Sequence, residues 1–367
     1  MNFDKKLAIA VGFLVVFGLV MMSSMSIAAS FDITGENDFY LKRHFWYIII
    51  GIVALIVAFK FPLDMLRKWS MLIYLGALGL MIATMFAGED YGTTAKLWLK
   101  IGGFSFQPIE IAKVAIIIFI SAIFGSGKLK ASSFEAGFMP FAVILGIPTI
   151  LLAIQSDFGG LAVLVLTASI IYFVAGANFK HFFGGAGVLS VLAVIVATTV
   201  PYIRKRMIIF LHPELDPLGA GFQVKQALIA IGSGGLWGRG FQNSIQKFDY
   251  LPEVQSDTIF AAISEEMGFF RILILIFIYL IIVWRGFAIA SKMHDKFYRY
   301  LAVGLSSLIT VQAFVNIGVN MALLPNTGIT LPFISYGGTS IIMMLVATGL
   351  LLQISTKVGE KHYKRYF

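Results

Sequence analysis

Residues 272–290 read ILILIFIYLIIVWRGFAIA, a run of nineteen positions in which Arg285 alone carries a charge. A helix that crosses a bilayer needs about 20 mostly apolar residues, because the hydrocarbon core is roughly 30 Å thick. This stretch therefore predicts a transmembrane helix. The same pattern recurs along the chain and predicts ten spans, over residues 7–29, 44–61, 70–87, 108–124, 138–154, 160–175, 182–202, 272–290, 300–324 and 337–354.

The composition of the whole chain agrees with that interpretation. Hydrophobic residues make up 59% of the 367 positions and charged residues 13%, against roughly 45–50% and 25% in soluble globular proteins. The sequence thus predicts an all-α integral membrane protein with a single domain over 1–367, and it excludes a soluble or disordered chain. The first span has an apolar run too long for a signal peptide, and we expect it to remain uncleaved.

Charge and residue content exclude several kinds of site. The chain has no cysteine, which excludes disulfides, thiolate catalysis and cysteine-ligated metals. Its five histidines are scattered without the spacing of metal ligands, so no metal site is expected. The net charge of +9 is explained by Lys and Arg in cytoplasmic segments, and no nucleic-acid partner is expected.

The distribution of Lys and Arg also predicts the topology. Most of them fall in the segments that lie on one side of the membrane when both termini are cytoplasmic. The segment 203–271, between spans seven and eight, is then a large extracytoplasmic loop, and loops of this length are usually functional. Within it, SDTIFAAISEEMGF predicts a short helix with Ser256 as N-cap and Gly268 as its C-terminal stop. We expect the loop to fold back onto the outer membrane surface.

The fourth span carries a polar group of residues at its outer end. QPIEIAK (107–113) holds Gln107, Glu110 and Lys113, and the last two are three positions apart, which places them on one helix face. Ionisable groups inside a span are costly unless they are paired, and they often mark a site. An ion pair that only fixes helix packing is the alternative.

Two further acids lie near the outer surface. Asp157 follows the fifth span in QSDFGG (155–160), where a solvated turn acid is an equally good interpretation. Asp257 ends YLPEVQSD (250–257), in the first turn of the expected short helix, where the helix dipole favours an ionised carboxylate. From its spacing alone, Asp257 is an ordinary helix N-terminal acid.

Two segments could bind substrate. The glycine-rich stretch GSGGLWGRG (232–240) lacks the GK[ST] of a P-loop, but Arg239 and nearby Lys247 and Lys225 could contact a lipid pyrophosphate; a flexible turn at the membrane is the alternative. LPNTGITLPFISYGGTS (324–340) holds too much Pro and Gly to be a continuous helix. Irregular backbone at membrane depth is tolerated where it lines a cavity or is buried in protein. We therefore expect it to be a pocket wall or a re-entrant packing turn, with candidate substrate contacts at Pro325, Thr327, Pro332, Ser335, Tyr336 and Gly337.

Together these motifs resemble the SEDS (shape, elongation, division and sporulation) family, which includes FtsW, RodA and SpoVE. LPNTGITLPFISYGGTS is similar to the closing signature of the family, QPIEIAK to its QPSExxK, and the 250–269 stretch to its YLPEAHTDFIFAxxxEExG. The sequence departs from those patterns at Ile109, Ser156, Gln255 and Thr258. GFQNSIQKFDYLP (240–252) resembles the division branch, that of FtsW.

The resemblance implies a peptidoglycan glycosyltransferase of the bacterial cytoplasmic membrane, at the division septum. Members polymerise lipid II at the outer face, release undecaprenyl pyrophosphate, and work with a class B penicillin-binding protein and other divisome membrane proteins. The essential acid of the family falls on Asp257, to which we assign the catalytic base, while Glu110, Lys113 and Asp157 complete the site. No cofactor is evident, although a divalent cation (Mg2+ or Mn2+) on the pyrophosphate is chemically plausible.

Two other functions fit the same architecture. A lipid II flippase would also use many spans and polar intramembrane residues, but it needs a site that both faces can reach. Gln107, Glu110, Asp157, Asp257 and the 325–338 segment all map to the outer half of the membrane, which favours the transferase. A non-catalytic scaffold for the transpeptidase is the third hypothesis, and it predicts that the carboxylates can be neutralised without loss of function.

Overall fold

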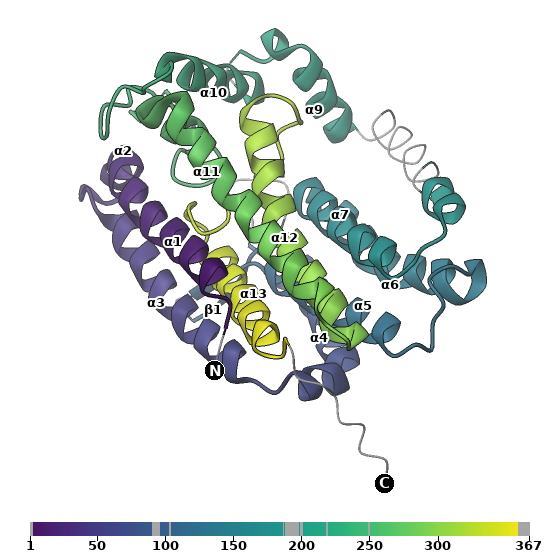
Figure 1. Cartoon of the computed structure of the whole chain (residues 1–367). Helices are drawn as coiled ribbons and strands as arrows, with labels where there is room; N and C mark the ends of the chain where they lie inside the picture. The colour runs from purple at the N-terminus through teal and green to yellow at the C-terminus, as the bar shows by residue number, and fades with distance from the viewer. Residues whose placement is uncertain are drawn as a thin grey trace.

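A computed structural model describes residues 3–89, 96–102, 104–185, 187, 198, 201–217, 219–248 and 250–358. These form a helical bundle with one small hairpin (Figure 1). The elements are α1 (Lys5–Met25), α2 (Ile27–Thr34), α3 (Phe39–Lys60), α4 (Leu63–Ala87), β1 (Leu99–Ile101), β2 (Phe104–Phe106), α5 (Pro108–Gly125), η1 (Phe134–Phe138), α6 (Met139–Ile154), α7 (Phe158–Val174), α9 (Pro201–Leu211), η2 (Pro213–Leu215), α10 (Ala220–Gly234), α11 (Ile259–Ser291), α12 (Lys296–Asn320) and α13 (Gly338–Thr356).

The protein is a multi-pass membrane protein, as the sequence predicts. Among the described residues, eight helices are long and apolar enough to cross a membrane, and α7 is a shorter apolar helix of 17 residues. Nine of the ten predicted spans overlie one of these helices. The seventh, 182–202, falls mostly outside the described residues, so the total of ten stays a prediction.

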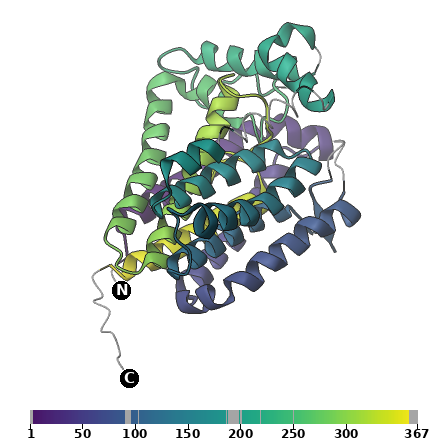
Figure 2. The same cartoon turned by 90° about the vertical axis from the view of Figure 1, so that its right-hand side faces the viewer.

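Three helices form the centre of the bundle. In α5, α12 and α13, 83% of the apolar window is buried inside the protein, against 22% in α3 and 33% in α4. The outer helices leave their apolar side chains exposed where lipid would cover them. In the two views α13 runs beside α3, and α11 runs beside α12 (Figures 1 and 2). A helix that is apolar on all sides is stable only when protein or lipid surrounds it, which explains this arrangement.

The two ends of the bundle differ in structure. α1 begins and α13 ends at the same end, where the backbone N–H of Asp4 donates to Ser355 Oγ at 2.9 Å and Arg285 pairs with the Asp4 carboxylate. At the opposite end lie α2, α9 and α10 (Figure 1). The β1–β2 hairpin directly precedes α5 and pairs Leu99 with Phe106. We call the end with α9 and α10 the outer end, because the distribution of Lys and Arg predicts that it faces away from the cytoplasm.

The start of α11 differs from the prediction. Thr258, not Ser256, is the N-cap residue. Helical geometry is interrupted at Gly268, as predicted, and a second helical stretch follows directly and continues to Ser291. Gly268 has φ 74°, and a Cβ at this position would lie 2.1 Å from the backbone nitrogen of Gly238. Only glycine fits such a conformation and contact. The expected short helix and the eighth span are therefore two helical stretches that meet at a kink at Gly268, and α11 comprises both.

Candidate active site

The segment between α12 and α13, residues 321–337, is irregular and folds into the outer half of the bundle. The Leu331 N–H donates to Ser335 Oγ at 2.7 Å, and the Ser335 N–H donates back to the Leu331 carbonyl at 3.0 Å. The hydroxyl of Tyr279, on α11, donates to the Pro332 carbonyl at 2.6 Å. These bonds satisfy backbone groups that a helix would otherwise pair, as burial away from water requires. The predicted break in the helix is therefore confirmed.

A row of amide side chains on α12 holds this segment in place. Gln312, Asn316 and Asn320 are four residues apart, which puts them on one helix face, and all three are buried. We call them the amide row. Asn316 Nδ2 donates to the carbonyls of Ile329 (2.6 Å) and Asp257 (2.8 Å), and Asn320 Nδ2 donates to the same Asp257 carbonyl at 2.8 Å. The row thereby joins the irregular segment to the residue predicted to be the base.

The predicted pair on α5 reaches the same row. Lys113 Nζ lies 2.8 Å from Glu110 Oε1 and 2.5 Å from Gln312 Oε1, with both charged side chains below 10% exposure. Gln312 Nε2 in turn donates to the Thr330 carbonyl (3.3 Å) and to Ser340 Oγ (3.2 Å). The ion pair is therefore part of a continuous polar network, while Glu110 Oε2 has no hydrogen-bond partner among the described residues.

Asp157 caps the start of α7 beside this network. Its Oδ1 accepts from the Gly160 N–H at 2.7 Å. A Cβ on Gly159 would lie 2.8 Å from the Thr327 carbonyl, so the start of α7 presses directly against the irregular segment. Burial raises the pKa of Asp157, and the charges of Lys113 and Arg206 partly offset that rise. Asp157 is therefore close to the predicted site and is not a solvated turn acid.

Asp257 lies two residues before the first residue of α11, not in its first turn as the sequence predicts. Its carboxyl is only partly exposed, and burial, with the negative charge of Glu253, raises its pKa to about 7. Hydrogen bonds from Ser256 and Gln223 act in the opposite direction. Desolvation thus outweighs the stabilisation expected from a helix terminus. A carboxylate with a pKa near neutral pH is suited to accept a proton.

Two residues that sequence analysis missed connect the outer loop to this site. Gln223, on α10, accepts a hydrogen bond from Asn326 Nδ2 at 2.6 Å, and Arg206 Nη1, on α9, donates to the Asn326 carbonyl at 3.0 Å. The loop therefore packs onto the irregular segment at Asn326.

Arg239 and Lys247 contact a separate network around the buried carboxylates of Glu265 and Glu266; Lys247 is itself buried, whereas Arg239 is exposed. Lys247 Nζ contacts Glu266 Oε1 (3.1 Å), Ser24 Oγ (2.9 Å) and the Gln242 carbonyl (2.7 Å), and the side chain is 2% exposed. Arg239 Nε lies 3.3 Å from Glu265 Oε1. Both cations are thus paired with carboxylates of α11. This arrangement favours a structural role for the two cations, in which they hold the 239–247 loop in place. The predicted contact with pyrophosphate is less favoured.

The remaining predicted substrate contacts lie within the irregular segment or, for Gln107, beside it. The Gln107 N–H donates to Thr339 Oγ1 at 3.0 Å, and the Tyr336 N–H donates to the Gln255 carbonyl at 2.8 Å. A Cβ on Gly337 would lie 2.9 Å from Thr330 Cγ2. Pro325 and Thr327 are partly exposed, and Thr327 Oγ1 has no partner among the described residues. Within the described part of the chain, no group of three or more His, Cys, Asp or Glu side chains could hold a metal ion.

The amide row gives a first prediction. Asn316→Ala leaves the Ile329 carbonyl without its donor and removes one of the two donors to Asp257, so we expect a loss of about 1–3 kcal/mol in stability. Thermal melting in detergent measures this loss. Ser307→Ala is the matched control, since Ser307 is buried on the same helix and its hydroxyl has no partner among the described residues. Equal melting of both variants would contradict the role of the row.

Known proteins match the chain over nearly its whole length. The family model described as "Cell cycle protein", that of FtsW, RodA and SpoVE, matches residues 5–360. Stage V sporulation protein E of Bacillus subtilis (strain 168) is 36% identical over 99% of this chain and 98% of its own length. A probable peptidoglycan glycosyltransferase FtsW of Geobacter sp. (strain M18) is 36% identical over 93% of this chain and 94% of its own.

Solved structures agree with these relatives. A chain solved in work on the structural coordination of polymerization and crosslinking by a peptidoglycan synthase complex superimposes with a TM-score of 0.83 at 25% identity, covering 98% of this chain and 100% of that one. The rod shape determining protein RodA of Thermus thermophilus has the same fold, with a TM-score of 0.73 at 23% identity over 98% of this chain and 99% of its own. The protein described here therefore belongs to the family of FtsW, RodA and SpoVE.

Proposed function

We propose that the protein is a peptidoglycan glycosyltransferase that polymerises lipid II. The growing glycan, linked to a lipid pyrophosphate, is the donor, and the 4-hydroxyl of incoming lipid II is the acceptor. Asp257 accepts the hydroxyl proton, the oxygen attacks C1 of the donor, and the C1–pyrophosphate bond breaks with inversion, which releases undecaprenyl pyrophosphate. The observation that carries this proposal is the raised pKa of Asp257, about 7, at a position fixed by the amide row.

The other predicted residues have supporting roles in this proposal. The pair of Glu110 and Lys113 braces the irregular segment through Gln312, and Lys113 contributes positive charge near the developing pyrophosphate. Asp157 fixes the start of α7 against that segment. A divalent cation, if the reaction uses one, binds chiefly to the oxygens of the pyrophosphate, since no group of three or more metal-binding side chains occurs among the described residues.

We further propose that the protein acts in septal cell-wall synthesis in the bacterial cytoplasmic membrane. It works there with a class B penicillin-binding protein and other divisome membrane proteins. The likeness to a chain of a peptidoglycan synthase complex supports the transpeptidase partner, and relatives with the name FtsW support the division role.

A lipid II flippase is the main alternative, and proteoliposomes separate it from the transferase. The polar network of Glu110, Lys113, Asp157 and Asp257 lies towards the outer end, so the transferase needs no path between the two faces. We expect labelled lipid II to cross the bilayer no faster with the protein than in empty liposomes, while glycan product forms. Accelerated crossing without product would support the flippase.

The pH dependence of polymerisation follows from the raised pKa. The base must be deprotonated to act, so kcat/KM should rise as pH increases through about 7 and level off above it. Glu253→Gln removes the negative charge that helps to raise the pKa of Asp257. The midpoint of the pH profile of this variant should therefore lie at a lower pH than the midpoint of the wild type. Glutamine keeps the shape at a residue with φ 55°. A profile that is flat between pH 5 and 9 would contradict Asp257 as the base.

A further inference from the structure

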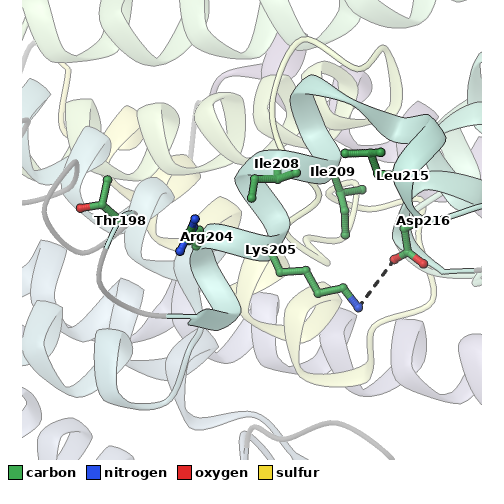
Figure 3. A pocket seen from close by; sticks show the side chains of 7 residues that line it. All are labelled: Thr198, Arg204, Lys205, Ile208, Ile209, Leu215 and Asp216. Carbon is green, nitrogen blue, oxygen red and sulfur yellow. Dashed lines mark ion pairs between the residues drawn. The ribbon is translucent and has the colours of Figure 1, made fainter.

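A cavity opens at the outer end, on the side of α9. It has a volume of about 390 Å³ and lies along α9 and the turn that follows it (Figure 3). Its lining combines cationic, acidic and apolar side chains, namely Thr198, Arg204, Lys205, Ile208, Ile209, Leu215 and Asp216. We call it the α9 pocket.

The positive charge of the α9 pocket is available to an incoming anion. Among the described residues no ion pair holds Arg204. Lys205 Nζ is 4.0 Å from Asp216 Oδ2, and the Lys205 side chain is 72% exposed. Exposed pairs of this kind contribute little stability, so an anion can displace Asp216 from Lys205 at small cost. Arg206, which follows directly, is already engaged by the Asn326 carbonyl.

The surroundings of the α9 pocket are apolar. Ile208 and Leu215, which line it, are 39% and 64% exposed, and Leu211 between them is 66% exposed. Such a surface at the outer end is stable when it lies against hydrocarbon. A cavity with cations and exposed aliphatic side chains together fits a ligand that has a phosphate group joined to a hydrocarbon chain.

We propose that the α9 pocket binds the pyrophosphate and the first isoprenoid units of the incoming lipid II, the acceptor substrate, while the donor's pyrophosphate lies near Lys113. This inference rests on the proposed function. It assigns the pyrophosphate to Arg204 and Lys205 instead of to Arg239 and Lys247, the contacts predicted from the sequence.

The pocket is next to the catalytic network, because Arg206 of α9 donates to the Asn326 carbonyl and Asn326 Nδ2 donates to Gln223, whose side chain is close enough to Asp257 to lower the pKa of its carboxyl. A lipid held by α9 would thus present its sugar towards the base.

Kinetics of the double variant Arg204→Ala with Lys205→Ala test this assignment. Loss of two charge-assisted contacts should raise the KM for lipid II by about tenfold or more, with kcat changed less than about twofold. Lys100→Ala is the matched control, because Lys100 is an exposed lysine of β1 outside the pocket, and it should keep the wild-type KM. A wild-type KM in the double variant would overturn the proposal.

A binding measurement separates this inference from the proposed reaction. Undecaprenyl pyrophosphate should raise the melting temperature of the wild-type protein in detergent, and the effect should be lost in the double variant but kept in Lys100→Ala. Equal stabilisation by phosphatidylglycerol would overturn the assignment to substrate and indicate a general phospholipid site. Specific binding by a protein that forms no glycan would uphold the pocket and reject the transferase.

Discussion

Replacement of Asp257 by asparagine is expected to lower the rate of glycan polymerisation by about 10²–10⁴-fold, the usual loss when a general base is removed. Asparagine keeps the size of the side chain, but it cannot accept the proton of the acceptor hydroxyl. The backbone carbonyl of Asp257, which Asn316 and Asn320 hold, is unchanged by the substitution. The variant should therefore fold and bind its transpeptidase. Gel analysis of glycan strands from lipid II, at matched protein levels, measures the rate.

A second acid in the same loop provides the control. Glu214 is 68% exposed and pairs only with His212 among the described residues, so Glu214→Gln removes one negative charge without touching the network around Asp257. We expect that variant to polymerise at the wild-type rate. If Asp257→Asn also polymerises at that rate, Asp257 is not the base, and the scaffold and flippase hypotheses regain support.

The second large effect concerns the buried pair on α5. Lys113→Ala leaves the Glu110 carboxylate uncompensated and removes the donor to Gln312 Oε1, so we expect a loss of about 3–5 kcal/mol in stability. Thermal unfolding in detergent measures this change in stability. The loss of the monodisperse peak with increasing temperature is the readout. Polymerisation should fall as well, because Gln312 also holds the Thr330 carbonyl of the irregular segment.

The double change of Glu110→Gln with Lys113→Met separates the cost of an unpaired charge from the loss of the pair itself. Since no charge is left buried alone, this variant should be more stable than Lys113→Ala. If each single variant melts and polymerises like the wild type, the pair stabilises neither the fold nor the site.

Much of the fold could be predicted because membrane helices leave a strong signal in sequence. Apolar runs of the right length locate nine of the helices, and Pro325 with Pro332 correctly mark the break between α12 and α13. The interruption of α11 at Gly268 was predicted, but its N-cap was not, because Ser256 and Thr258 are both of a type that caps helices. Sequence also could not show that a second helical stretch follows Gly268 directly, at a point where the loop at Gly238 packs closely and leaves no room for a side chain.

The candidate site was predicted in part. Sequence patterns identified the acids and Lys113, whose charges are conspicuous in or beside apolar spans. They missed the amide row, although Gln312, Asn316 and Asn320 recur every four residues in an apolar helix and could have been found by that spacing. Spacing cannot reveal which carboxylate pairs with a given cation. For that reason Lys247 was assigned to substrate, while the structure pairs it with Glu266.

The most direct test of the account is whether the purified protein makes glycan from lipid II in detergent, where no bilayer exists to be crossed. The protein should be assayed with a class B penicillin-binding protein whose transpeptidase serine has been removed, so that neither crosslinking nor any transport can contribute. We predict glycan strands and one undecaprenyl pyrophosphate released for each disaccharide added. Unchanged lipid II, with a folded protein and a bound partner, would contradict the assignment as a glycosyltransferase.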